Sequence, residues 1–326
     1  MSSSYADRAR QYAIDVVEGT IPACRFVQLA CNRHLDDLAQ VDDSGFQWEF
    51  DEAKANRICA FKELLPHVKG TWAKRNELLK LSPHQIFITV CIWGWVSKAT
   101  GLRRFWRAYI EIPRKNGKST DTAGNGLYMF AADGEFGAEV YSGAGSEKQA
   151  WEVFGPARLM AKRTPELCEQ FGIQVNAKNL HILGTGSKFE PVIGKPGDGA
   201  SPSMSITDEY HEHKTDDQYD TMVTGMGSRD EPLAYVITTA GDDIAGPCYA
   251  LRQEVVAMLE GTIPNDELFG IIFTIDEDDD WTDPESLRKA NPNMGVSVSE
   301  KYLLSQVRDA INNPRKQATV KKKHFN

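Results

Sequence analysis

A Gly-Lys-Ser triplet at residues 117–119 is the first feature of the sequence that could do chemistry. It follows a β-prone run at residues 107–112 and a polar turn, and it opens a stretch that we expect to be helical. In this order, backbone N–H groups and the start of a helix face phosphates, and the lysine reaches the phosphate oxygens. The first glycine of the general G-x-x-x-x-G-K-[ST] pattern is missing, because Ile112 stands there. Lys118 and Ser119 are candidates for binding nucleotide phosphate and Mg²⁺.

A pair of carboxylates gives the second chemical feature. Asp208 and Glu209 end the short β-prone run at residues 203–207. An ATP-hydrolysing enzyme needs one carboxylate at a strand end for hydrated magnesium and a second that orients or deprotonates the attacking water. Each motif alone is common in surface turns, but together they favour a nucleotide hydrolase.

Two further segments lie near these motifs in the expected fold. The run at residues 235–237 ends in Thr238, Thr239 and Ala240, small residues that could sense the γ-phosphate at a strand end. His211 and His213 suggest a zinc site, but their spacing is not H-E-x-x-H, and we expect His211 to line the phosphate pocket instead.

The elements that must position these residues alternate along the chain. Beyond about residue 72, short β-prone runs alternate with helical stretches at residues 150–162 and 249–259. This alternation predicts an α/β protein with a mostly parallel sheet flanked by helices, which binds its ligand at the carboxyl ends of the strands. The β-prone runs are residues 107–112, 139–142, 180–183, 204–207, 233–238 and 269–275.

The two ends of the chain have a different character. Residues 1–70 show helical periodicity, including a helix near Asp51 that should carry Ile58, Phe61 and Leu64 inward. We therefore expect a helical N-terminal appendage at residues 1–70, an ATPase core at 71–275 and a lid or linker at 276–326. The acidic run at residues 276–280 suggests a solvated loop, with two helical segments after it.

Composition and charge set broad limits. The chain has 326 residues, of which 41% are hydrophobic and 25% charged, and a net charge of −9, unlike a generally basic DNA-binding protein. No apolar run approaches the roughly 18 residues of a membrane helix. The first residues also lack the apolar stretch of a secretion signal. The six cysteines show no C-x-x-C spacing, which favours buried thiols. We expect a cytoplasmic protein with no membrane contact.

Taken together, the motifs resemble those of the large terminase subunit of tailed double-stranded DNA phages of the lambdoid type. The resemblance covers almost the whole chain and is carried by the segments IPAC, RHLDDL, LSPHQ, RKNGKS, DEYHEH, GMGSR, TTAG and ANPN. In this family an arginine-containing turn usually replaces the first glycine, so Ile112 and Arg114 strengthen the resemblance. The implied fold is a P-loop fold of the RecA/ASCE type.

The resemblance also implies roles for individual residues. Gln85 would contact adenine, Arg114 would assist the phosphates within the same subunit, and Glu209 would activate water. The implied nucleotide-binding set is Gln85, Arg114, Lys115, Asn116, Gly117, Lys118, Ser119 and Thr120. The implied catalytic set is Glu209, Lys118, Arg114 and Arg229, the metal set is Ser119 and Asp208, and the coupling set is Thr238, Thr239 and Ala240.

Members of this family work in assemblies. The resemblance implies an ATP- and Mg²⁺-dependent motor in the host cytoplasm that drives double-stranded DNA into the procapsid without sequence preference. Its partners would be the portal protein and the small terminase subunit. A ring of identical subunits, usually five, would let a neighbour supply a cation to the γ-phosphate, and the candidates are Arg229 and Lys195.

Large terminases also contain a nuclease domain with clustered acidic metal ligands. We expect that domain to be absent from this chain, and we therefore expect no DNA cleavage by it.

Two other functions fit part of the pattern. Residues 208–211 match the D-E-x-H box of nucleic-acid helicases, but few residues follow for the second ATPase domain that helicases need. A packaging fragment without ATPase activity is the other alternative, and the presence of Lys118, Ser119, Asp208 and Glu209 argues against it.

Overall fold

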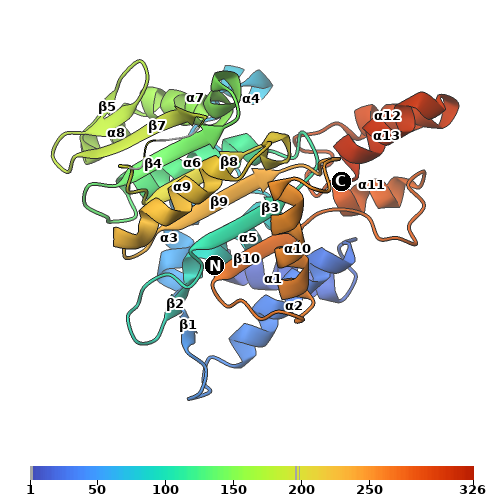
Figure 1. Cartoon of the computed structure of the whole chain (residues 1–326), viewed down its shortest axis with the longest axis horizontal. Coiled ribbons are helices and arrows are strands. Elements are labelled where there is room, and N and C mark those ends of the chain that lie inside the picture. The colour runs from blue at the N-terminus through green and yellow to red at the C-terminus, as the bar shows by residue number, and fades with distance from the viewer. Residues whose placement is uncertain (1–2, 195–196, 198) are drawn as a thin grey trace.

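The structure, a computed structural model, describes residues 3–194, 197 and 199–326. Its centre is an eight-stranded sheet with the order β10-β3-β9-β8-β4-β7-β6-β5 (Figure 1). The first six strands in this order run parallel, and β6 and β5 are antiparallel to their neighbours. The strands are β3 (Arg107–Glu111), β4 (Glu139–Ala144), β5 (Ile173–Val175), β6 (Leu180–Ile182), β7 (Ser187–Ile193), β8 (Met204–Asp208), β9 (Leu233–Thr238) and β10 (Leu268–Ile272). The expected mostly parallel sheet is confirmed.

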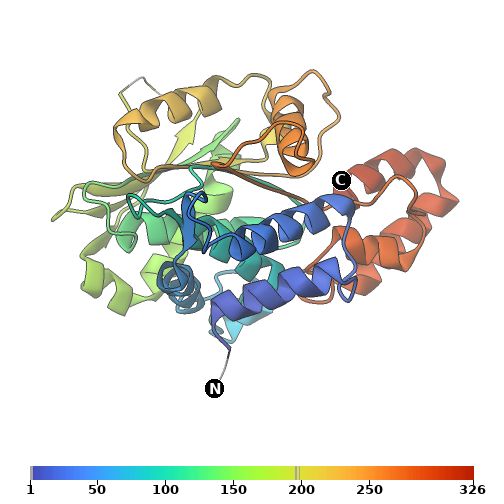
Figure 2. The same ribbon diagram turned by 90° about the horizontal axis from the view of Figure 1, so that it is seen from below.

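Helices cover both faces of this sheet, as expected. Every residue of β8, β9 and β10 is therefore buried. Figure 2 shows the yellow and orange helices over one face and the blue to green helices over the other. The first face carries α9 (Asp217–Gly225) and α10 (Pro247–Leu259), and the other carries α1 (Tyr5–Val17), α3 (Glu52–Glu63), α5 (Pro83–Gly94) and α6 (Lys118–Ala131).

The β-prone runs recognised in the sequence all lie on strands of this sheet, but β7 was not expected. Its sequence includes Lys188, Glu190 and Pro191, which interrupt any apolar pattern. The strand forms because it pairs in parallel with β4, where Pro191 lies opposite Ser142. The expected helices at residues 150–162 and 249–259 are confirmed within α7 (Glu147–Arg163) and α10. The remaining short helices of this part are α8 (Pro165–Phe171), η1 (Tyr210–Glu212) and η2 (Met226–Ser228).

The N-terminal segment is helical, with one exception. It holds α1, α2 (Arg25–Ala39) and α3, and α4 (Gly70–Lys74) follows, but β1 (Trp48–Phe50) pairs antiparallel with β2 (Trp95–Ser97). Asp51 caps α3 by accepting the Lys54 N–H at 2.8 Å. Ile58 and Phe61 are buried as expected, whereas the prediction for Leu64 was wrong, since it is 63% exposed just beyond the helix end. The buried side chains of these helices belong to the same hydrophobic core as the sheet.

The C-terminal segment has a small core of its own. It contains α11 (Pro284–Ala290), α12 (Glu300–Asn312) and α13 (Pro314–His324), one helix more than expected, beside the sheet in Figure 1. Its buried apolar residues are Leu287, Ala290, Val298, Leu303, Val307, Ala310, Val320 and Phe325. The acidic run is not simply solvated: Asp276 and Asp279 both bind Lys289, at 3.1 and 2.7 Å. Asp276 also accepts the N–H of Arg25 at the start of α2.

Two other expectations concern cysteines and membranes. All six cysteines are free thiols, and all but the half-buried Cys168 are buried. Over the described residues, no helix combines the length and apolar character needed to cross a bilayer.

Candidate active site

The loop between β3 and α6 wraps around the start of α6. Lys115 and Gly117 both have positive φ angles, 73° and 86°, and such angles are easiest for glycine. No side chain of the described part of the chain caps α6, so the N–H groups of its first turn are available to a ligand. Ser119 and Thr120 lie half-buried on this turn. The loop has the form of an anion site.

Lys118 begins α6 and lies close to the two carboxylates. Its Nζ donates a hydrogen bond to the carbonyl of Ile112 at 3.1 Å, across the loop. Burial lowers the pKa of Lys118, while Glu209 and Asp208 act in the opposite direction. Two carboxyl groups at the end of β8 therefore act on the ammonium even without a phosphate.

Asp208 and Glu209 stand at the carboxyl end of β8, and only β9 separates β8 from β3. Asp208 is 2% exposed. Burial, with a further contribution from Glu209, raises the pKa of Asp208 to about 7. Its Oδ1 accepts the Glu209 N–H at 2.9 Å. Glu209 has a φ of 48°, a left-handed conformation that is uncommon for a residue with a side chain and that turns the chain sharply after the strand.

His211 lies between Glu209 and the end of β9. Its Nδ1 lies 3.3 Å from Glu209 Oε2 and 3.0 Å from Thr238 Oγ1. Burial lowers the pKa of His211 despite the opposing effect of Glu209 and Glu212. The expectation that His211 belongs to this site agrees with its position.

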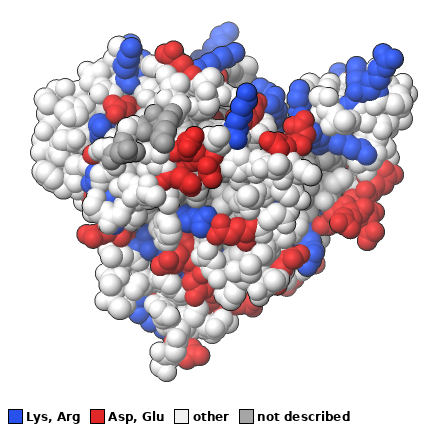
Figure 3. Space-filling view, viewed as in Figure 1, with Lys and Arg blue, Asp and Glu red and all other residues white. Residues whose placement is uncertain are grey.

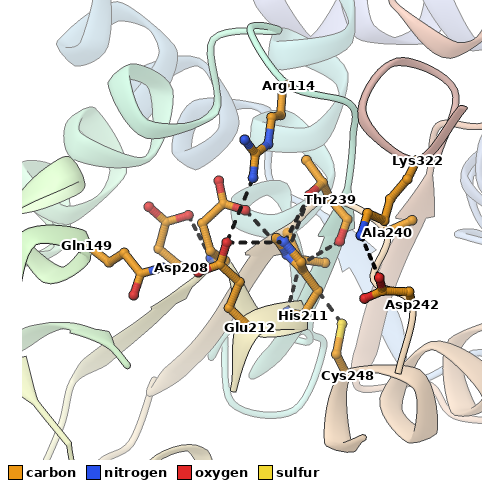
Figure 4. Close-up of polar contacts among 12 residues, drawn as sticks. Arg114, Gln149, Asp208, His211, Glu212, Thr239, Ala240, Asp242, Cys248 and Lys322 are labelled. Atoms are coloured by element: carbon orange, nitrogen blue, oxygen red, sulfur yellow. Dashed lines mark hydrogen bonds and ion pairs between the residues drawn. The ribbon is translucent and has the colours of Figure 1, made fainter. Parts of the chain in front are cut away.

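Arg114 lies over the same edge of the sheet. Its Nη2 is 3.8 Å from Glu212 Oε1, and Gln149 donates a hydrogen bond to the other oxygen of Glu212 (Figure 4). The Arg114 N–H donates to the carbonyl of Lys323 at 3.1 Å. Glu212 and Gln149 had no predicted role, because only the turn of η1 brings Glu212 toward Arg114.

Asn116 joins the loop to the C-terminal segment. Its side chain is 1% exposed and donates to the carbonyl of Pro113 at 3.1 Å and to Asn291 Oδ1 at 2.9 Å. Asn293 completes the contact by donating its side chain to the Asn116 carbonyl at 3.0 Å. The Asn116 side chain is thus occupied by these protein contacts, and its expected part in nucleotide binding stays a prediction. The sequence did not reveal this contact, although an Asn-Pro-Asn segment between two helices was visible.

Gln85 lies beside the loop on the first turn of α5. Its Oε1 accepts the Ser82 N–H at 2.9 Å, which completes the cap of that helix. A Cβ added to Gly117 would come within 3.1 Å of Gln85 Nε2, so Gln85 and the loop are in close proximity.

The three expected coupling residues lie next to the loop. Ile112 N–H donates to the carbonyl of Thr238 at 3.0 Å, which joins the start of the loop to the end of β9. Thr239 Oγ1 is 3.4 Å from His211 Nδ1, and the Ala240 N–H donates to Asn326 Oδ1 at 3.1 Å.

The structure describes one of the two candidate finger residues, Arg229. The Arg229 guanidinium donates hydrogen bonds to the Ser201 carbonyl at 2.8 Å, to Glu135 Oε1 at 2.9 Å and to the Gly137 carbonyl at 3.0 Å. Its side chain is only 13% exposed. These contacts hold the guanidinium within its own subunit, and its role as a finger residue stays a prediction. The other candidate, Lys195, lies outside the described residues.

Comparison with protein families establishes what this site belongs to. A family model for the ATPase domain of the terminase large subunit matches residues 83–256, more than half of the chain. The chain therefore belongs to the terminase large subunit family, and the resemblance recognised in the sequence is confirmed.

Individual relatives agree with this assignment. Protein YmfN of Escherichia coli (strain K12) is 60% identical over 132 residues, which cover 40% of this chain and 29% of YmfN. The large terminase subunit of Enterobacteria phage HK97 is 29% identical over 224 residues, which cover 67% of this chain and 44% of that protein. The crystal structure of the HK97 large terminase has the same fold, with a TM-score of 0.71 and 24% identity over 83% of this chain and 55% of that one. The matches thus span less than half the length of these curated relatives.

One expectation about domains is corrected by a second family match. A model of the terminase endonuclease domain matches residues 262–326, so part of that domain is present where we expected none. In the structure this stretch forms β10 and the helices α11 to α13. Across the described residues, no group of three or more His, Cys, Asp or Glu side chains is arranged to hold a metal ion.

Proposed function

We propose that this chain is the ATP-hydrolysing motor of a phage DNA-packaging machine. The observation that carries the proposal is the position of Lys118 and the Asp208–Glu209 pair at one edge of the sheet, with only β9 between their strands. The family match supports it, because the ATPase model covers both motifs.

The nucleotide phosphates would bind at the start of α6. The free N–H groups of the first turn and the Lys118 ammonium would face the phosphate oxygens, and Lys118 would exchange its bond to the Ile112 carbonyl for a phosphate. Arg114 is near enough to assist from the same subunit. For the base, Gln85 is the candidate contact, and it lines a small cavity of about 20 Å³ together with Asn116 and Lys118.

Asp208 and Ser119 are suitable ligands for Mg²⁺. Asp208 is a buried carboxylate with a raised pKa and, among the described residues, a single hydrogen bond to its side chain, so a cation beside it would relieve the cost of its burial. Ser119, on the first turn of α6, offers a hydroxyl ligand. Bound there, Mg²⁺ would neutralise charge on the phosphates.

Glu209 would act on water. The water oxygen attacks the γ-phosphorus, the bond to the β–γ bridging oxygen breaks, and ADP leaves with that oxygen while the water proton passes to the Glu209 carboxylate. The turn after β8 directs this carboxylate toward the sheet edge, where His211 lies beside it.

The wider assembly follows the family. We propose that copies of the chain form a ring on the portal in the host cytoplasm, recruit DNA with the small terminase subunit, and move duplex DNA through non-specific phosphate contacts. Thr238, Thr239 and Ala240 would pass the state of the nucleotide to the DNA-gripping part. Neither a helicase nor a fragment without ATPase activity accounts for the family match as well.

Phosphate release by the purified chain tests this function. We expect hydrolysis of ATP with Mg²⁺, none when the metal is chelated, and equal stimulation by duplexes of unrelated sequence that weakens steeply as salt is raised. Nucleotide binding without phosphate release, with Mg²⁺ and DNA both present, would refute the motor function for this chain.

A further inference from the structure

The His211 side chain lies where η1 and the ends of β8 and β9 are in contact. Its imidazole comes from η1, next to Glu209 after β8 and Thr238 at the end of β9, and is only 10% exposed. Thr238 Oγ1 lies 3.0 Å from Nδ1 and also accepts the backbone N–H of His211 at 3.1 Å. These contacts join the two strand ends through one residue.

The direction of the hydrogen bonds follows from the Thr238 hydroxyl. This hydroxyl has one proton and donates it to the Thr239 carbonyl at 2.8 Å. Its oxygen must therefore accept from His211, which places a proton on Nδ1. In the neutral ring Nε2 then carries no proton, and it lies 3.5 Å from Thr239 Oγ1 and 3.7 Å from Glu212 Oε1.

The same Nδ1 proton has a second acceptor. Glu209 Oε2 lies 3.3 Å from Nδ1, and this buried oxygen has no properly formed hydrogen bond from any described residue. One N–H cannot make two full bonds, so Glu209 and Thr238 compete for it. When the Glu209 carboxylate rotates away from His211 to bind the attacking water, the hydrogen bond from His211 Nδ1 to Thr238 should become shorter.

We propose that His211 is a positioning residue that holds the Glu209 carboxylate and transmits its movement to Thr238 at the end of β9. The inference deepens the proposed function, on which it rests, by identifying how the coupling residues sense the reaction. The signal would continue along the chain, because the Thr238 carbonyl accepts the Ile112 N–H and therefore contacts the phosphate loop.

Kinetics of a double-mutant cycle form the first test. His211→Phe and Thr238→Val should each lower kcat about tenfold with nearly unchanged nucleotide affinity, since both break one relay. The double variant should also lose about tenfold rather than a hundredfold. Thr238→Ser keeps the hydroxyl and should restore most of the rate, which a packing defect would not allow. Additive losses, or a Thr238→Ser variant as slow as Thr238→Val, would overturn the relay.

A spectroscopic test does not depend on hydrolysis. Nitrogen NMR of histidine-labelled protein should show His211 protonated on Nδ1, with a resonance that moves in Glu209→Gln and in Thr238→Val. His213→Phe is the control variant. It removes an imidazole two residues from His211 that contacts neither Glu209 nor Thr238 among the described pairs. A change in the His211 resonance that also occurs in this variant would reflect only a nearby structural change. A proton on Nε2 would overturn the proposal whatever the ATPase activity. An Nδ1 proton in a chain that does not hydrolyse ATP would contradict the proposed function but not the contact through which His211 positions Glu209.

Discussion

Asn116 in the phosphate loop donates a 2.9 Å hydrogen bond to Asn291, which lies 175 residues further along the chain, and both side chains are 1% exposed. Asn293 extends the contact to Ser82 at the start of α5, at 2.6 Å. The shape of the loop therefore depends on the C-terminal segment, and nucleotide binding should respond to changes there.

Asn293→Ala should weaken nucleotide binding although the residue has no proposed contact with the nucleotide. The change leaves the buried Asn116 carbonyl and the Ser82 hydroxyl without partners, at a cost of about 1–3 kcal/mol in unfolding free energy. Titration with a fluorescent ATP analogue and urea unfolding would measure both effects. Asn312→Ala, at an exposed position at the end of α12, is the control and should behave as wild type. An unchanged affinity in Asn293→Ala would show that the loop keeps its shape unaided.

Lys62→Met should destabilise the fold strongly. Lys62 is fully buried, pairs with Asp121 on α6 at 2.7 Å and donates to Thr89 at 2.9 Å. Removal of the ammonium leaves Asp121 as an uncompensated charge, which typically costs about 3–5 kcal/mol. In the Lys62→Met, Asp121→Leu double variant much of the loss should be recovered, as judged by urea unfolding. A double variant no more stable than Lys62→Met would show that packing, rather than charge, dominates at this position.

Stability should fall in mild acid through His34. This histidine is buried and accepts the Trp95 Nε1–H at 3.1 Å. Burial lowers its pKa from 6.5 to about 3. In mild acid the imidazole is therefore protonated in the unfolded chain and neutral in the folded protein. Going from about pH 7.5 to about pH 5.5, His34 alone should cost about 1.4 kcal/mol of unfolding free energy. Urea unfolding of His34→Gln should show a smaller loss than wild type over this interval by about that amount, whereas equal losses would mean that His34 is protonated in the folded state.

Arg229→Ala should affect folding rather than catalysis. The guanidinium joins Glu135 and Gly137, before β4, to Ser201, before β8, so its loss should cost about 1–3 kcal/mol of stability. ATP turnover per folded subunit should stay near that of wild type, in a comparison that includes thermal unfolding of the same samples. A large fall in turnover with unchanged stability would return Arg229 to the role of a finger residue.

Much of the fold could be predicted from local patterns. The parallel strands that carry the site are short, apolar and buried on both faces, so their sequences reveal them. β7 could not be found this way, because Pro191 and its charged neighbours form a strand only through pairing with β4. Leu64 was misplaced for a related reason: helical periodicity does not show that α3 ends at Glu63.

The site was predictable where motifs are contiguous and unpredictable where contacts span the chain. Lys118, Asp208 and Glu209 stand at strand and helix ends, and their chemistry could be inferred from type and position. The Asn116 contact with Asn291 joins distant segments, and no local pattern indicates it. In the same way, an arginine in a glycine-rich turn does not show that Glu135 binds it.

The most direct test of the account compares Glu209→Gln with Lys118→Ala in nucleotide binding and in phosphate release. Glu209→Gln should bind ATP with wild-type affinity and lose about 10²-fold or more of its turnover, because only the group that activates water is removed. Lys118→Ala should lose both binding and turnover, since it removes a phosphate contact, and Lys148→Ala, on the first turn of the nearby α7, should lose neither. Wild-type turnover in Glu209→Gln or Lys118→Ala would contradict the assignment of this sheet edge as the ATPase site.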